Sequence, residues 1–449
     1  MEPLQNKFHI ADGAAVISPD GKLLLAGRTA RSLIDEFGSP LIVMLEDVIR
    51  RRCREYRERI EIYPRSRVYY ASKAFLTTGF CRLIQQEGLG LDVVSAGELH
   101  TAMAAGFPPE MVLLHGNAKT LEELSLALEY GVGRIVIDNL AEIDRLAEMT
   151  AKTGRSQKVF IRVTPGVKPH THKYVQTGQV DSKFGFNLEG GAAEEAARRV
   201  MEIPGLEFVG IHCHIGSQIF EYEIFSVAAR LMMEFYAFCR NSLGAPLDEI
   251  NMGGGLGIKY MPDDAPPRVT DHLERLVRTI KEDAEEYGVP LPVLCDEPGR
   301  SIVGEAGITL YTVESVKKIP GVRNYASVDG GMTDNPRHAL YGARHHVMLA
   351  ERANEQATGA WSISGKCCES GDMLATDAPL PEPLPGDILA MLSTGAYTYS
   401  MASNYNRVPR PAVVLAGANG VALLARRETP ADIVELDEIP EWLKKAAGA

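Results

Sequence analysis

Short apolar runs alternate with longer amphipathic segments over most of the first 300 residues of the chain. The amphipathic segments repeat apolar residues at helical spacing, as in 119–131, 139–149 and 271–288. The apolar runs show little polar alternation, which predicts strands buried on both faces of a parallel sheet. Eight runs are expected to form strands: 68–72, 91–95, 112–116, 134–138, 159–163, 208–216, 249–255 and 293–299.

Eight strands that alternate with helices favour a (β/α)8 TIM-type barrel over a doubly wound sheet. We therefore predict an α/β protein whose residues 39–300 form the barrel.

The regular alternation stops near the end of the predicted barrel. Later apolar runs, at 307–319 and 324–332, are separated by loops instead of long helices. Residues 14–27 have the pattern of a hairpin and contain no barrel unit. The sequence therefore predicts a second, β-rich domain formed by residues 1–38 and 301–449.

Composition narrows the classes of partner and location. A chain of 449 residues is too long for one ordinary core. Its net charge of −12, with no dense Lys/Arg tract, argues against nucleic-acid and anionic-membrane partners. No apolar run approaches a membrane span, and the N-terminus lacks the pattern of a secretory signal. Seven cysteines without C-x-x-C spacing indicate free thiols, so we expect a cytoplasmic protein.

A single lysine, Lys73, follows the apolar run in VYYASKAFL. In a barrel of this type the active site lies at the carboxyl ends of the strands. Lys73 is therefore either a solvated strand end or an amine held partly desolvated for chemistry. Further polar residues at expected strand ends favour a site at this mouth: Ser95, His115, Asp138, Arg162, His214, Ser217, Glu297 and Arg300.

Two motifs at later strand ends each allow two interpretations. The glycines of NMGGGLGI (251–258) form either a flexible turn or a phosphate site with accessible N–H groups. In HCHIGSQ, His212 and His214 are either a metal pair or include an imidazole that stacks on an aromatic ring, with Ser217 near a phosphate. No further ligands at metal spacing are evident, so we expect no metal. His212 shares the facing of His214, and we expect it to be packed rather than functional.

Glu297 in DEPGR suggests which ring such an imidazole would meet. A carboxylate at the barrel mouth can keep a pyridine nitrogen protonated, which makes the ring an electron sink. A lysine for an imine, a glycine loop for a phosphate and this carboxylate together specify pyridoxal 5′-phosphate (PLP).

The chain closely resembles the diaminopimelate decarboxylase family, which belongs to the alanine-racemase-like, fold-type III group of PLP enzymes. The resemblance implies decarboxylation of meso-2,6-diaminopimelate to L-lysine and CO2, the last step of lysine biosynthesis. The matching segments, in order, are YYASKAF, LDVVSAGEL, TPGVKPHTHKYVQTGQVDSKFGF, HCHIGSQI, GGGLGI, DEPGR, PRHALYGA, GKCCESGDML and GAYTYSMASNYN.

The resemblance also implies roles for individual residues. Lys73 would bind PLP covalently, His214 would stack on its ring, and Glu297 would pair with the ring nitrogen. The other implied cofactor contacts are Ser217, Gly254, Gly255, Gly299, Arg300 and Tyr397. The implied substrate contacts are Arg300, Arg337, Tyr341, Glu369 and Tyr397.

The GKCCESGD segment implies a site shared between two subunits. In the doublet Cys367–Cys368, we choose Cys368 because it directly precedes Glu369, as in the family motif. The resemblance has both residues reach into the neighbouring active site, where the cysteine donates the proton to Cα; Lys73 is the rival donor. We therefore expect a homodimer in which the β-rich domain completes the active site and the interface.

The choice of substrate has a physical rationale. The distal end of diaminopimelate carries a carboxylate, which suits Arg300 and Arg337, and an ammonium, which suits Glu369. A decarboxylase of ornithine or lysine would not need the arginines. The alternatives are a related PLP decarboxylase of a basic amino acid or polyamine precursor, a non-catalytic PLP-binding protein, and a metal-dependent hydrolase that uses His212 and His214.

Overall fold

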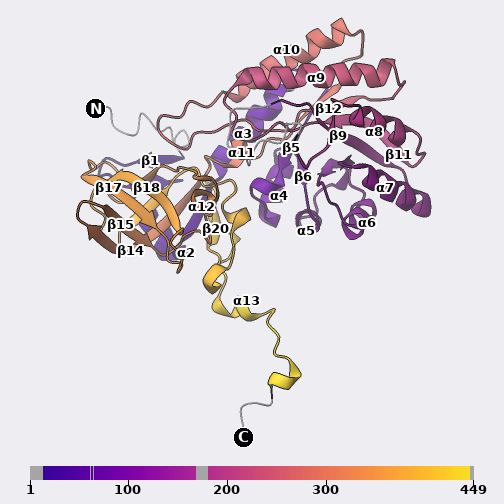
Figure 1. Cartoon of the computed structure of the whole chain (residues 1–449). Coiled ribbons are helices and arrows are strands. Elements are labelled where there is room, and N and C mark those ends of the chain that lie inside the picture. The colour runs from indigo at the N-terminus through magenta and orange to yellow at the C-terminus, as the bar shows by residue number, and fades with distance from the viewer. Residues whose placement is uncertain (1–13, 61, 64, 168–180, 445–449) are drawn as a thin grey trace.

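The computed structural model describes residues 14–60, 62–63, 65–167 and 181–444, which form two domains (Figure 1). Residues 1–13 of the expected second domain, and most of the segment TPGVKPHTHKYVQTGQVDSKFGF, lie outside the described residues. Within the described part, no helix combines the length and the apolar character that crossing a membrane requires.

Eight parallel strands close into a barrel in the first domain. Their hydrogen-bonded order is β5-β6-β7-β8-β9-β11-β12-β13, and β13 pairs with β5 to complete the ring. All eight expected strands are confirmed, and a short strand, β10 (Phe186–Asn187), pairs with β9. The barrel strands are β5 Ser66–Ala71, β6 Gly90–Val93, β7 Val112–Leu114, β8 Arg134–Ile137, β9 Gln157–Thr164, β11 Leu206–His212, β12 Glu249–Asn251 and β13 Val293–Asp296.

Helices between the strands cover the outside of the barrel (Figure 1). Several begin at a side-chain cap: Thr120 and Glu123 form a capping box at α6, and Asn139 accepts from the Glu142 N–H at α7. These caps satisfy N–H groups that have no partner within the helix. The helices are α3 Glu46–Ile60, α4 Thr78–Gln86, α5 Ala96–Ala104, α6 Leu121–Tyr130, α7 Leu140–Thr153, α8 Ala192–Met201, α9 Tyr222–Asn241, α10 Val269–Glu286 and α11 Arg300–Val303.

Side chains fill the barrel interior and form the floor of its mouth. At the amino ends of the strands, buried Glu249 pairs with Arg134 at 2.5 Å and with Arg67 at 2.6 Å. Above this ion-pair cluster lies an apolar layer of six buried residues, Tyr69, Leu113, Val136, Phe160, Val293 and Cys295.

The second domain is built on a sheet with the order β18-β17-β15-β14-β4-β20-β21, and β19 pairs with both β14 and β16. The expected hairpin is confirmed as β1 and β2, which join β3 in a small sheet. The strands and helices of the second domain are β1 Ala15–Ile17, β2 Leu23–Leu25, β3 Arg28–Thr29, α2 Ala30–Phe37, β4 Leu41–Leu45, β14 Gly307–Ile319, β15 Arg323–Val328, α12 Arg337–Tyr341, β16 Val347–Leu349, β17 Gly359–Ser364, β18 Met373–Leu380, β19 Ile388–Met391, β20 Ala412–Gly417, β21 Gly420–Ala425 and α13 Pro430–Val434.

Strand β4 places the border between the domains later than residue 39, where the barrel was expected to begin. It pairs antiparallel with β14 and parallel with β20, so residues 41–45 belong to the sheet of the second domain. The five residues of β4 are all buried. Their apolar run resembles a barrel strand, but its partners come from the last third of the chain.

Candidate active site

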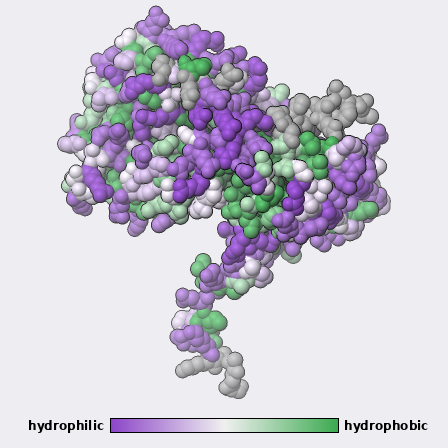
Figure 2. Space-filling model, turned by 180° about the vertical axis from the view of Figure 1, so that it is seen from behind, coloured by the Kyte–Doolittle hydropathy of each residue, from purple (hydrophilic) through white to green (hydrophobic). Residues whose placement is uncertain are grey.

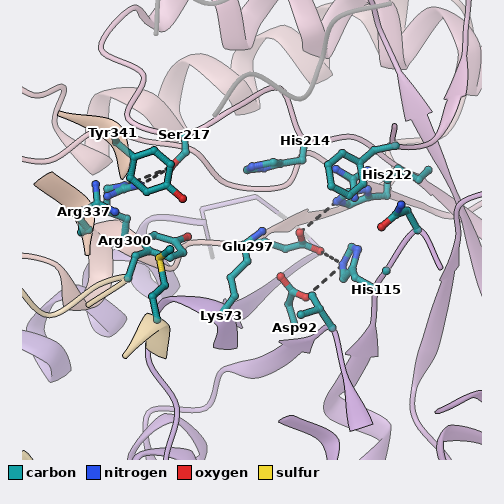
Figure 3. A pocket seen from close by; sticks show the side chains of 17 residues that line it. Lys73, Asp92, His115, His212, His214, Ser217, Glu297, Arg300, Arg337 and Tyr341 are labelled. Atoms are coloured by element: carbon teal, nitrogen blue, oxygen red, sulfur yellow. Dashed lines mark hydrogen bonds and ion pairs between the residues drawn. The ribbon is translucent and has the colours of Figure 1, made fainter. Parts of the chain in front are cut away.

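A cavity of about 400 Å³ lies at the carboxyl ends of the barrel strands and reaches the second domain (Figure 3). It brings together Lys73, His214, Ser217, Glu297, Arg300, Arg337, Tyr341 and Tyr397 from the expected site residues. The other residues that line it are Asp92, Val94, His115, Gly116, Asn117, Arg162, Phe184, His212 and Met401.

Lys73 lies in a short 3-10 helix, η2 (Ser72–Ala74), directly after β5. The chain on either side is fixed, because the Tyr70 hydroxyl donates to the Phe75 carbonyl at 2.8 Å. From the second domain, the Tyr397 N–H donates to the Ala74 carbonyl at 2.9 Å. The side chain of Lys73 points into the cavity, between two groups of polar residues (Figure 3).

The surroundings of Lys73 favour its charged form. Desolvation acts to lower its pKa, but the Tyr397 oxygen and the Asp92 and Glu297 carboxylates outweigh it, so the pKa is raised. The lysine is nevertheless exposed, because its side chain projects into the open cavity. The amine is therefore accessible to a ligand.

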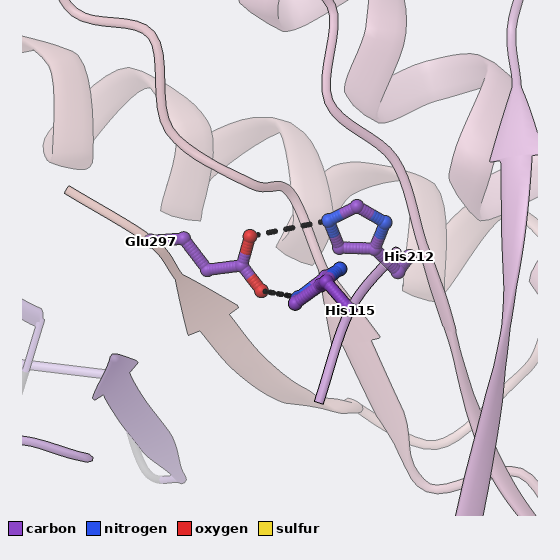
Figure 4. A group of neighbouring side chains, drawn as sticks. All are labelled: His115, His212 and Glu297. Carbon is purple, nitrogen blue, oxygen red and sulfur yellow. Dashed lines mark hydrogen bonds and ion pairs between the residues drawn. The ribbon is translucent and has the colours of Figure 1, made fainter. Parts of the chain in front are cut away.

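Glu297 is the centre of a buried hydrogen-bond network (Figure 4). Its Oε1 accepts from His115 Nε2 at 2.8 Å and from Asn251 Nδ2 at 2.7 Å, and its Oε2 accepts from His212 Nε2 at 3.2 Å. Desolvation acts to raise the pKa of Glu297, but the two histidines outweigh it and hold that pKa well below its ordinary value. Glu297 is therefore an ionised carboxylate held from several sides.

Asp92 adds a second carboxylate to this end of the cavity. It is buried on β6, and its Oδ1 lies 3.7 Å from His115 Nε2. Desolvation, with a further contribution from the charge of Glu297, raises the pKa of Asp92. The pKa values of the two carboxylates are thus shifted in opposite directions, because Glu297 is the one that accepts strong hydrogen bonds.

His214 is a neutral imidazole at the wall of the cavity. Desolvation and the nearby positive charges of Lys73 and Arg162 lower its pKa well below the ordinary value. Its Nδ1 accepts from the Gly254 N–H at 3.2 Å, which requires that this nitrogen carry no proton. A neutral ring in a fixed orientation is suited to stacking on a flat ligand.

The glycines of the site allow close approach of backbone segments. A Cβ on Gly254 would lie 2.2 Å from the Glu297 carbonyl oxygen. At Gly255, where φ is +122°, it would lie 2.4 Å from the Gly216 carbonyl oxygen. A Cβ on Gly299 would lie 2.9 Å from that of Ala71, where α11 begins beside β5. These positions require glycine because the strand ends pack tightly around the cavity.

Arg300 connects the barrel to the second domain. Its Nε and Nη2 donate to Ser217 Oγ at 3.2 and 3.0 Å, and its Nη1 donates to the Tyr260 hydroxyl. Its guanidinium also lies 4.6 Å from the centre of the Tyr397 ring. The hydroxyl of Ser217 is thereby held at the cavity wall.

Arg337 lies toward the opposite end of the cavity from Glu297, on the other side of Lys73 (Figure 3). Its guanidinium is buried among the rings of Tyr260, Tyr341 and Tyr397, with distances of 5.5, 5.7 and 5.8 Å to their centres. Desolvation lowers its pKa. Its Nε has no hydrogen-bond partner in the described part of the chain. A buried cation with an unused donor is suited to binding an anion.

Cys368 and Glu369 lie outside the cavity of their own chain. Both are exposed, and the Cys368 N–H donates to Asn406 Oδ1 at 2.8 Å. Cys367, the other thiol of the doublet, is partly buried, and desolvation raises its pKa to about 11.

Two residues expected at the mouth have structural partners instead. Ser95 caps α5, where its hydroxyl accepts from the Glu98 N–H at 3.2 Å. Asp138 accepts from the Gly185 N–H at 2.9 Å. Neither residue lines the cavity.

His212 is packed, as expected, since it is 1% exposed and its ring centre lies 4.6 Å from that of His115. His212 lines the cavity and binds Glu297, and desolvation lowers its pKa to about 3. One group of side chains has the spacing of metal ligands: His115, His212 and Glu297, whose ligand atoms lie within 4.8 Å of one another. This group differs from the pair His212 and His214 that the sequence suggested. Their contacts have the lengths of hydrogen bonds from imidazole to carboxylate.

Several polar residues of the site had no predicted role, among them Asp92, Asn251 and Tyr260. Asp92 interrupts the otherwise apolar strand β6, and this interruption was the available signal, whereas Asn251 is the last residue of β12, whose sequence is Glu-Ile-Asn. Tyr260, which contacts Arg300 and Arg337, follows the glycine loop and had no such signal.

The residues present fit PLP. This cofactor needs an amine for its aldehyde, a carboxylate for its ring nitrogen and polar groups for its phosphate. Lys73 and Glu297 face one cavity, and the Ser217 hydroxyl lies on its wall. A volume of about 400 Å³ accommodates a small ligand.

The fold and the site define a barrel enzyme of the PLP-dependent class. The family model described as "Pyridoxal-dependent decarboxylase, pyridoxal binding domain" matches residues 46–304, which begin at α3 and end just after α11. The relatives and solved structures below then specify the family: the chain belongs to the diaminopimelate decarboxylases.

Two relatives illustrate the similarity in sequence. The diaminopimelate decarboxylase of Bacillus subtilis (strain 168) is 48% identical over 418 residues, covering 93% of this chain and 95% of that protein. The one from Mycobacterium tuberculosis (strain H37Rv) is 42% identical over 426 residues, with 93% and 95% covered.

Solved structures of diaminopimelate decarboxylases are also similar to this chain. Diaminopimelate decarboxylase from M. jannaschii, in complex with L-lysine, has a TM-score of 0.90 and 34% identity, covering 97% of this chain and 100% of that one. The enzyme from Helicobacter pylori with L-lysine has a TM-score of 0.83 and 28% identity, with 90% and 98% covered.

Proposed function

We propose that this protein decarboxylates meso-2,6-diaminopimelate to L-lysine and CO2 with PLP, at a site completed by a second copy of the chain. The observation that carries this proposal is a single cavity with Lys73 in the middle, ionised Glu297 at one end and buried Arg337 at the other. The near full-length similarity to diaminopimelate decarboxylases supports the same reaction.

The barrel residues hold the cofactor. When bound, PLP supplies an electron sink for the electron pair of the breaking C–C bond. Lys73 would attach PLP, and Glu297 would keep the ring nitrogen protonated, because His115 and His212 hold that carboxylate ionised. The neutral His214 ring would stack on the cofactor ring. Ser217, Gly254, Gly255 and Gly299 would hold the cofactor phosphate, with Arg300 and Tyr397 as further contacts.

The second-domain end of the cavity holds the part of the substrate that does not react. Arg337 binds the distal carboxylate, because its guanidinium is desolvated and its Nε lacks an acceptor in the described residues. Arg300 and Tyr341 assist from the same wall, and Glu369 of a second copy pairs with the distal ammonium. This anchoring excludes ornithine and lysine, which have no distal carboxylate.

The proton that replaces CO2 at Cα comes from a side chain on one face. A thiol is suited to this step because its pKa lies near neutrality. We assign it to Cys368 of a second copy, since Cys368 is exposed and lies outside the cavity of its own chain. The catalytic site then requires a homodimer, with the β-rich domain at the interface. We also propose a cytoplasmic location, which suits the seven free cysteines.

Two assays test this proposal. Purified protein with PLP is expected to release CO2 from meso-diaminopimelate and to leave ornithine and lysine almost untouched. Preferential turnover of ornithine or lysine would instead support a decarboxylase of basic amino acids. Mixing Lys73→Ala with Cys368→Ala chains, each inactive alone, is expected to restore about a quarter of the activity, because only one site of a mixed dimer is intact. No restoration would contradict the shared site.

A further inference from the structure

The last described residues leave the body of the protein. After β21 ends at Ala425, the chain forms the short helix α13 and then projects away from both domains (Figure 1). We call residues 434–443 the C-terminal arm.

The arm exposes an unusual amount of apolar surface. Space-filling atoms coloured as hydrophobic are visible along the projecting segment (Figure 2). Large apolar side chains in water are normal when scattered singly, but a group of them marks an interaction site. The exposed fractions are 53% for Val434, 93% for Leu436, 66% for Ile439, 79% for Trp442 and 59% for Leu443.

The root of the arm is fixed beside the GKCCESGD segment. Arg407 Nη2 binds Asp437 Oδ2 at 2.6 Å, and Arg407 Nη1 donates to the Ile433 carbonyl at 2.9 Å. The preceding residue, Asn406, accepts the hydrogen bond from the Cys368 N–H. The arm and the Cys368 loop are therefore joined through a single intervening turn.

We propose that the C-terminal arm packs against a second copy of this chain. This inference rests on the proposed function, in which the Cys368 loop enters the active site of that second copy. A copy close enough to receive Cys368 also lies next to the adjoining arm, whose apolar side chains it covers. Glu435, Glu438 and Glu441 lie between these side chains, so the arm does not suit an anionic membrane.

Tryptophan fluorescence tests the proposal directly, because the chain has only two tryptophans. Trp361 is 2% exposed, whereas Trp442 is 79% exposed in the single chain. In full-length protein with Trp361→Phe, we expect Trp442 to emit at short wavelength in the dimer and to shift to longer wavelength on dilution to monomer. Emission typical of water in a dimer verified by sedimentation would overturn the proposal, and so would a shift that appears only with lipid vesicles.

Substitutions then measure the contribution of the arm. We expect Leu436→Asp with Trp442→Asp to raise the dimer dissociation constant roughly ten- to hundredfold, because buried anchors dominate an interface. Activity per chain should fall at low protein concentration and recover at high concentration. The matched control is Val322→Asp, on an equally exposed residue (78%) just before β15. It should change neither the dimer dissociation constant nor the activity per chain.

The two proposals fail in different ways. If the arm variant dimerises like the wild type and mixed chains still complement, the arm is not at the interface and the shared site stands. If the wild type is a fully active monomer, both the shared site and the arm contact are wrong.

Discussion

The two ends of the cavity differ in how many hydrogen-bond partners their buried charged side chains have. At the barrel end, Glu297 accepts hydrogen bonds from His115, His212 and Asn251. At the second-domain end, Arg337 is equally buried, yet its Nε has no acceptor in the described residues. We call these the closed end and the open end.

This difference indicates what each end is for. A buried carboxylate with three donors is held in one charge state and one orientation before any ligand arrives, and such preorganisation is the main electrostatic contribution to catalysis. A buried arginine with an unused donor is costly to the free protein, and an anionic ligand relieves that cost. The closed end therefore suits chemistry, and the open end suits recognition.

The largest expected effect comes from neutralising the closed end. Glu297→Gln should lower kcat roughly a hundred- to a thousandfold, because the amide cannot hold a positive charge on a ring nitrogen. Steady-state decarboxylation measures this. The matched control is Glu249→Gln, a buried carboxylate paired with Arg134 at the other end of the same barrel. It should lower the melting temperature but leave kcat nearly unchanged; an equal loss of kcat in both variants would mean that barrel stability explains the effect.

A smaller effect is expected at the open end. Arg337→Ala should lower kcat/KM for diaminopimelate roughly ten- to hundredfold, mainly through KM, because a charged hydrogen bond to the distal carboxylate is lost. The small residual turnover of lysine, which lacks that carboxylate, should not fall further. Arg344→Ala removes an exposed arginine nearby and should have no effect. Undiminished turnover of diaminopimelate by Arg337→Ala would show that the specificity argument is wrong.

The smallest effect concerns the stability of the closed end at acid pH. The pKa of His212 is about 3 in the folded protein against an ordinary 6.5, so the unfolded chain binds the proton first as pH falls. Its contribution is complete above pH 6.5 and decreases from there toward pH 3, by at most about 1.4 kcal/mol per pH unit. The part of the stability that depends on His212 should therefore decline on acidification, and His212→Asn should remove that part from the measured pH dependence.

Urea unfolding of the PLP-free protein at pH 7 and pH 5 measures this slope. His272 on α10, buried against Phe225 of α9, offers the control, because desolvation also lowers its pKa, to about 4. His272→Asn should flatten the slope and leave kcat unchanged, whereas His212→Asn should reduce kcat as well. A slope unaffected by His212→Asn would contradict the proposed protonation behaviour.

Local pattern was sufficient for the barrel but not for the other sheet. The eight barrel strands are apolar runs whose partners are neighbours in sequence, or the two ends of the series, so counting them was enough to predict the ring. Strand β4 has the same apolar character, but it pairs with β14 and β20. Nothing within residues 41–45 identifies such distant partners, so the border was placed too early.

The site shows a similar limit. Lys73 and Glu297 could be found because they follow buried strands, where a barrel has its active site. The same rule gave Ser95, which instead caps α5, since Ser is also a common helix cap. Asp92 and Asn251 point inward from within strands and were missed. Arg337 comes from the second domain, and only the family resemblance suggested it.

The most direct test of the central claim is reduction of the PLP-loaded protein with borohydride, followed by peptide mapping. We expect the cofactor mass on the peptide that contains Lys73, loss of visible absorbance on reduction, and no labelled peptide in Lys73→Ala. A label on another lysine, or no label in freshly purified wild-type protein, would contradict the assignment of Lys73 and the functions built around it.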